Sequence, residues 1–111
     1  MSHVSMEKEQ VIYQLVVPGP IEDVEELRVL EWHGDVNQEF LVDELIVELE
    51  THKAIVEVRA GQRGFLRQVL GEAGSWEKIG KPLALLSDAS DEAIPASLDG
   101  VAPLLAAFEV M

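Results

Sequence analysis

The sequence predicts an all-β fold, a flattened β-barrel or sandwich of two antiparallel sheets with pseudo-twofold symmetry. Two observations favour it. The chain contains a series of short apolar segments rich in Val, Leu and Ile, separated by Gly, Asp and Asn. Such spacing is typical of an all-β domain. In addition, the central part of the chain resembles itself when it is shifted by 37 positions.

The first expected strand ends at Pro18-Gly19-Pro20, because proline lacks a backbone N–H donor and Gly-Pro pairs turn the chain. An acidic loop, residues 21–26, follows it. The segment 45–50 has some helix formers, but its shortness and the β-branched residues beyond it favour a strand. The complete set of expected strands is 11–17, 27–32, 40–42, 45–50, 54–59, 65–70 and 82–86.

The 37-position shift lays residues 29–49 over residues 66–86. Trp32 then falls on Val69, Ile46 on Leu83 and Leu49 on Leu86, so the apolar positions agree although identity is low. Two similar halves are expected to pack face to face. The same shift carries Lys53 onto Ser90, so only one half presents an amine.

Composition excludes several classes of function. The net charge of −13, from 21 acidic and 8 basic residues, repels nucleic acids and anionic membranes and favours partners with basic patches. The absence of cysteine excludes disulfides and thiolate chemistry. The three histidines lack metal-ligand spacing, so no metal site is expected. Neither a targeting segment nor a membrane-spanning run is evident, and a cytoplasmic, monomeric domain is the expectation.

We expect one domain with a tail: a disordered N-terminus over residues 1–7, the β domain over 8–87, and an acidic linker with a short apolar tail over 88–111. In the tail, apolar residues recur at helical spacing, and Pro103 limits any helix to about two turns. The apolar residues are Leu98, Val101, Leu105 and Phe108. The tail could dock on the barrel, bind a partner or begin a further segment.

Lys53 is the candidate functional residue. It lies in the run Glu50-Thr51-His52-Lys53-Ala54 between two expected strands, so a hairpin would display its amine at the tip. The central residues are not those that primed two-residue turns favour, and a type I turn is expected. We also expect Glu48, Glu50 and Glu57 around the tip. An ordinary surface lysine on a loop is the alternative.

Segment 11–87 resembles the lipoyl domain of 2-oxoacid dehydrogenase complexes, in the biotinyl/lipoyl attachment family. The family's Glu-Thr-Asp-Lys-Ala signature corresponds to residues 50–54. Further matches are Pro18, Trp32, Gly64, Gly74 and the run 80–83, and the span 18–83 needs no gap. The sequence departs from the family pattern at His52, in place of Asp, at Asn37-Gln38, in place of a Gly-Asp pair, and at Ile21 and Ser75.

The resemblance implies a carrier domain that is not itself an enzyme, with lipoate attached to Lys53 as a swinging arm. Implied partners are a thiamine-dependent 2-oxoacid dehydrogenase, a dihydrolipoamide acyltransferase core, dihydrolipoamide dehydrogenase, and a lipoate ligase or lipoyl-transfer enzyme. It also implies recognition roles for residues near the lysine and in the first loop. These residues are Glu50, Thr51, His52, Ala54, Glu22 and Asp23.

Three alternatives remain open at this point. Biotin carriers of the same family place Met on both sides of the lysine, where this chain has His52 and Ala54, so lipoate is favoured. An interaction module that keeps the barrel without any cofactor is the second alternative, prompted by the missing Gly-Asp pairs. The chain could also be a module of the acyltransferase or a stand-alone carrier. A tail ordered against the barrel would favour the stand-alone protein.

Overall fold

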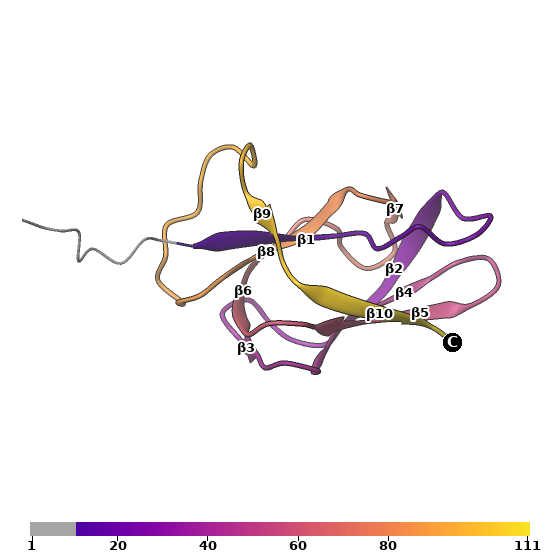
Figure 1. Ribbon diagram of the computed structural model, residues 1–111, viewed down its shortest axis with the longest axis horizontal. Helices are drawn as coiled ribbons and strands as arrows, with labels where there is room; N and C mark the ends of the chain where they lie inside the picture. Colours follow the sequence, from indigo (N-terminus) through magenta and orange to yellow (C-terminus); the bar gives the residue numbers. More distant parts are fainter. Residues whose placement is uncertain (1–10) are drawn as a thin grey trace, which may run out of the picture.

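The structure is a computed structural model that describes residues 11–111, and every regular element in this range is a β-strand (Figure 1). The expected disordered segment 1–7, which includes His3, lies outside the described residues. The ten strands are β1 (Ile12–Val16), β2 (Glu26–Trp32), β3 (Glu39–Phe40), β4 (Leu45–Glu50), β5 (Ile55–Ala60), β6 (Gly64–Val69), β7 (Trp76–Lys78), β8 (Pro82–Ser87), β9 (Ala102–Pro103) and β10 (Ala106–Val110).

The strands form two five-stranded sheets, in the orders β3-β6-β8-β1-β9 and β10-β5-β4-β2-β7. Their inner faces enclose one apolar core, because alternate residues of strands such as β2, β5 and β6 point inward. The core includes Leu15, Val29, Phe40, Ile46 and Leu86. The predicted all-β sandwich is therefore confirmed. Within residues 11–111, all strand pairings are antiparallel except that of β9 with β1, which is parallel.

The predicted internal symmetry is also present. A shift of 37 residues carries β4 onto β8, and it carries β2 and β3 onto the ranges of β6 and β7 to within one residue at each end. The loops repeat too. Asn37 and Gly74 both have positive φ (78° and 97°), and so do Asp43 and Gly80 (76° and 91°). Asn and Asp tolerate this left-handed conformation better than most residues, so Asn37 occupies a site that suits glycine.

The tail forms strands, so the helix suggested by its apolar spacing is wrong. β9 pairs with β1, and β10 pairs with β5 along its whole length. Leu104, between them, is buried, and its N–H donates to Gln14 O at 2.8 Å. Without the tail, β1 and β5 would be open edges with unpaired backbone groups. Pairing of these backbone groups stabilises the tail as strands more than its apolar spacing stabilises a helix. Pro103 is tolerated because edge strands accept proline.

β7 was not predicted from sequence, because its three residues carry little apolar signal. It pairs with β2 at the edge of the second sheet, with Arg28 opposite Trp76. Within residues 11–111 there is no helix with the length and apolar content needed to cross a bilayer.

Candidate functional site: the lysine at the β4–β5 turn

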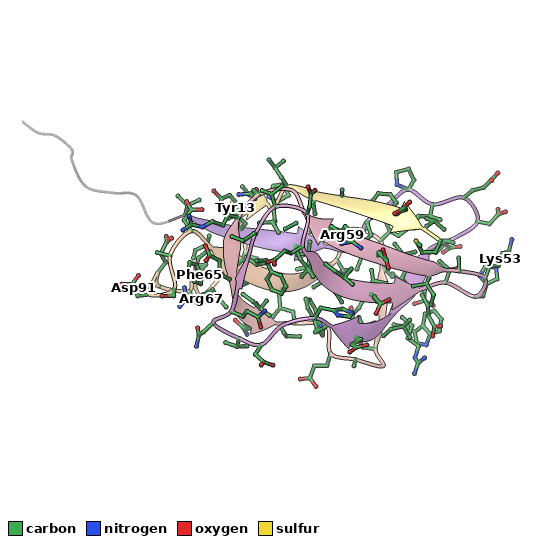
Figure 2. The ribbon with its side chains drawn as sticks, turned by 90° about the horizontal axis from the view of Figure 1, so that it is seen from below. Tyr13, Lys53, Arg59, Phe65, Arg67 and Asp91 are labelled. Atoms are coloured by element: carbon green, nitrogen blue, oxygen red, sulfur yellow. The ribbon has the colours of Figure 1, made fainter. Side chains whose placement is uncertain are left out.

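Lys53 lies at one end of the long axis of the molecule. Residues 51–54 connect β4 to β5, and the Thr51 N–H donates to Ala54 O at 2.8 Å, which closes the turn. His52 and Lys53 are both exposed. Figure 2 shows the Lys53 side chain projecting from this end, with Asp91 at the opposite end. Among residues 11–111, no partner forms an ion pair with the Lys53 ammonium.

Thr51 organises the turn. Its side chain is buried, and its Oγ1 accepts hydrogen bonds from the N–H groups of Lys53 (3.0 Å) and Ala54 (2.9 Å). Threonine hydroxyls stabilise turns in this way. Neither His52 nor Lys53 has positive φ, which excludes the primed turns and agrees with the expected type I geometry. The backbone that carries Lys53 is therefore held by the residue two positions before it.

The predicted ring of carboxylates around the tip is only partly present. Glu50 lines the pocket that contains Lys53, and its Oε1 accepts a hydrogen bond from Arg28 Nη1 at 2.7 Å. Glu48 and Glu57 lie opposite each other farther down the hairpin. Each has its own partner: Glu48 Oε1 contacts His33 Nε2 at 2.7 Å, and Glu57 Oε1 accepts from Arg59 Nη2 at 3.1 Å. The expectation was wrong for Glu48 and Glu57, because sequence position alone does not show which residues their side chains contact.

The first loop approaches the lysine turn. Asp23 and His52 line one surface pocket together with Trp76 and Lys78. Asp23 follows Glu22 in a tight turn in which the Val24 N–H donates to Ile21 O at 3.1 Å. Glu22 is exposed on the same turn but does not line this pocket.

Sequence reasoning missed three residues at this end. Trp76 is 51% exposed and lines the loop pocket with Lys78. Met111 lines the Lys53 pocket with residues 50–55. No local pattern points to Trp76 or Lys78, since β7 is short. Met111 reaches the turn only because the tail pairs with β5.

Three potential ligand groups also meet on the outer face of the second sheet. Atoms of Glu31, His33 and Glu48 lie within 4.8 Å of one another. Histidine spacing along the chain predicted no metal site, and it could not reveal this cluster, because β2–β4 pairing brings the residues together. The His33–Glu48 contact joins the residue after β2 to β4 within the second sheet.

The chain is thus a domain of two sandwiched sheets with an exposed lysine on a closed hairpin turn. A family model described as "Biotin-requiring enzyme", the biotin/lipoyl family, matches residues 13–86. The chain belongs to this biotinyl/lipoyl attachment family.

Known relatives are components of 2-oxoacid dehydrogenase complexes. The dihydrolipoyllysine-residue succinyltransferase of the 2-oxoglutarate dehydrogenase complex of Staphylococcus saprophyticus is 32% identical over 77 residues, which is 69% of this chain and 18% of the relative. The mitochondrial protein X component of the pyruvate dehydrogenase complex of Saccharomyces cerevisiae is 29% identical over 77 residues, 68% of this chain and 19% of the relative. The succinyltransferase of Escherichia coli K12 is 36% identical over 61 residues, 55% of this chain and 15% of the relative.

The chain thus spans less than a fifth of the length of these relatives. It corresponds to the lipoyl-domain type of the family, a carrier module rather than a catalytic one. The tail beyond residue 86 lies outside the family match.

Proposed function

We propose that the chain is a lipoyl carrier, with lipoate in amide linkage to Lys53 Nζ, which shuttles acyl groups and reducing equivalents between the active sites of a 2-oxoacid dehydrogenase or related lipoate-dependent complex. The observation that carries this proposal is the exposed Lys53 side chain on a turn whose backbone is fixed at both ends. Bound lipoate would supply a dithiolane, whose disulfide accepts an acyl group and two electrons.

The residues present fit such a group. The Lys53 amine projects into solvent and has no ion pair among the described residues. Amide formation at Nζ removes the charge of the ammonium. Because Lys53 has no ion-pair partner among the described residues, this loss of charge leaves no counter-ion unpaired. Thr51 and the strand pairs of β4 and β5 hold the attachment point still. A rigid attachment point keeps a tethered group within a defined reach and raises its local concentration near partner sites.

The domain contributes position and recognition to this cycle. We propose that Glu50, Thr51, His52 and Ala54 are read by the lipoate ligase or lipoyl-transfer enzyme. Asp23 shares a pocket with His52, which supports a role for the first loop, with Glu22, in docking the thiamine-dependent dehydrogenase. An acyltransferase core and dihydrolipoamide dehydrogenase complete the proposed partners. The charge of −13 favours basic docking faces and a rate of encounter that falls with salt.

The structure bears on the alternative of a module without cofactor. That alternative was prompted by the missing Gly-Asp pair at residues 37–38. Asn37 adopts φ +78°, so the loop keeps the backbone conformation that glycine would provide. The departure from the family pattern is therefore compatible with an intact carrier scaffold.

Intact-mass measurement tests the proposal. After co-expression with a lipoate ligase and lipoate, the wild-type chain should gain the mass of one lipoyl group, and Lys53→Arg should gain none. Co-expression with a biotin ligase, followed by avidin blotting, tests the biotin alternative. A lysine that remains unmodified with ligases of several specificities would overturn the carrier proposal.

A further inference from the structure

The last strand of the chain runs directly to the lysine turn. In β10, the register extends from Ala106 opposite Ala60 to Val110 opposite Val56. One residue further, the Met111 N–H donates to Ile55 O at 2.8 Å. Figure 1 shows β10, in yellow, beside β5 and ending near the β4–β5 turn. The tail therefore reaches the residue that begins β5, two positions after Lys53.

This pairing holds the β4–β5 hairpin from a second side. In the order β10-β5-β4-β2-β7, β5 is an interior strand. Removal of β10 would make β5 the edge, and its outward N–H and C=O groups would lose their partners. Ile55 would then be held only by β4. Because strands rise about 3.3 Å per residue, a bond at Ile55 acts within about 7 Å of the Lys53 backbone.

Met111 also enters the site itself. It lines the pocket formed by residues 50–55, which includes Glu50, His52 and Lys53. Its side chain is 63% exposed, so an enzyme that approaches the Lys53 amine can contact it. The tail thus adds a large, flexible apolar side chain beside the smaller apolar contributions of Ala54 and Ile55 to this surface.

We propose that β10 is a positioning and recognition element of the Lys53 site, contributed by a segment outside the shared attachment domain. It fixes the direction of the β4–β5 hairpin by pairing with β5. It also adds Met111 to the surface that a cofactor-attaching enzyme reads. The recognition half of this inference rests on the proposed function, whereas the positioning half does not.

Hydrogen-bond alternation provides a matched pair of variants. Leu105 O accepts from the Gly61 N–H at 2.7 Å, and the Met111 N–H donates to Ile55 O. Bonded residues alternate along an antiparallel strand, so the Ala107 N–H faces β5 and the Ala106 N–H faces the free edge. Ala107→Pro therefore removes a bond to β5. Ala106→Pro introduces the same ring without removing one, because free-edge amides tolerate proline.

The first measurement needs no cofactor. Amide hydrogen exchange over residues 55–60 should accelerate about tenfold or more in Ala107→Pro and stay near the wild-type rate in Ala106→Pro. Unchanged protection of β5 in Ala107→Pro would overturn the inference, whether or not the chain can be lipoylated. Lack of lipoylation in the wild-type chain would instead overturn the proposed function alone.

The second measurement separates recognition from simple support of the fold. With a lipoate ligase that modifies the wild-type chain, Ala107→Pro should raise the KM for the carrier about tenfold and leave kcat nearly unchanged. Met111→Ala should raise KM about threefold without changing exchange over residues 55–60. Ala106→Pro is the control in both assays.

A purely supporting tail gives a different pattern. It would lower the denaturation midpoint of Ala107→Pro while KM stayed at the wild-type value, and Met111→Ala would be silent in every assay. A wild-type KM in Ala107→Pro or in Met111→Ala would overturn the recognition role. Acetylation of Lys53 by a small amine-reactive ester should proceed at similar rates in all variants, since the amine is already exposed. A large change in that rate would show that the variants alter exposure of the amine rather than its recognition.

Discussion

The two ends of the sandwich are related by the internal symmetry, yet they are built differently. At one end, β4 and β5 are joined by the short turn that displays Lys53. At the other end, β8 finishes at Ser87 beside the start of β1, with Ile12 opposite Ser87. The chain does not connect these two strands there, because β1 precedes β8 by the length of the domain. The internal symmetry thus relates the paired strands of the two halves, whereas the segments at the two ends differ.

Polar groups seal the second end. Glu92 is only 5% exposed, and its carboxylate accepts hydrogen bonds from the N–H groups of Val11 and Ala89. Ser87 Oγ is buried, donates to Ala89 O and accepts from Arg67 Nη1 at 3.0 Å. Position 90, the counterpart of Lys53, is an exposed serine. One end therefore uses its side chains to close the fold, whereas the other leaves an amine free.

The largest expected effect follows from moving the amine between the ends. Lys53→Arg should abolish lipoylation, and the double variant Lys53→Arg with Ser90→Lys should not recover it, because Ser90 lies in a longer segment without the Thr51-centred turn. Intact mass after co-expression with a lipoate ligase measures both. Single Ser90→Lys is the control for folding. Modification at residue 90 would show that exposure alone suffices for the attaching enzyme.

Core truncation should affect the two halves equally. Leu49 and Leu86 are symmetry counterparts, and neither is exposed at all. Replacing either by Ala should lower the free energy of unfolding by about 2–5 kcal/mol, since each leaves a cavity between the sheets. Urea denaturation followed by tryptophan fluorescence measures this. A difference above about 2 kcal/mol between the variants would show that the halves share a fold but not a packing environment.

At the sealed end, Glu92→Ala should lower the free energy of unfolding by about 1–3 kcal/mol, because two N–H donors lose a buried acceptor. Exposed Asp91 is one residue away, and Asp91→Ala serves as the control of equal charge change. Thermal denaturation of both variants decides the point. Equal effects of the two substitutions would contradict a structural role for the Glu92 carboxylate.

At the lysine end, Thr51→Val should cost about 1–2 kcal/mol, because Lys53 and Ala54 lose the hydroxyl that accepts their N–H groups. Thr51→Ser keeps the hydroxyl and should retain most of the stability. Hydrogen exchange at residues 53 and 54 reports the local effect. Slow exchange in the valine variant would show that the strands, and not Thr51, hold the turn.

The smallest effect is expected for Glu50→Gln. Its ion pair with Arg28 at 2.7 Å is partly exposed, with 43% of the Arg28 side chain and 28% of the Glu50 side chain accessible. Such pairs contribute about 0–1 kcal/mol. Any larger loss should therefore appear in the KM of the attaching enzyme rather than in stability. Denaturation and lipoylation kinetics of the same variant separate the two roles.

Much of the fold could be predicted from the sequence, because buried strands appear there as apolar segments bounded by turn residues. Strands β4 and β8, with the repeat that relates them, could be predicted in this way. β10 could not, because all five of its residues are exposed and its place depends on the open edge of β5. The same holds for the Glu31–His33–Glu48 cluster, which arises from pairing across strands.

The residues of the candidate site also fall into those that could be predicted from the sequence and those that required the structure. The place of Lys53 on a hairpin turn could be predicted from its flanking residues, since these are local, but its candidate role depended on the family resemblance over residues 18–83. The recognition role of Asp23 was suggested by family resemblance and not by any local pattern, and the pocket that Asp23 shares with His52 required the structure. Trp76 and Met111 needed the folded sheet, because residues distant along the chain meet only through strand pairing.

The course of the tail has a practical consequence for work with this protein. A tag or fusion partner appended after Met111 would emerge beside Lys53 and obstruct enzymes that approach the amine. Ile12, by contrast, lies opposite Ser87 at the far end of the molecule. Immobilisation through the amino-terminal side should therefore leave the reactive end facing solution, which makes it the preferred orientation for surface-based binding assays.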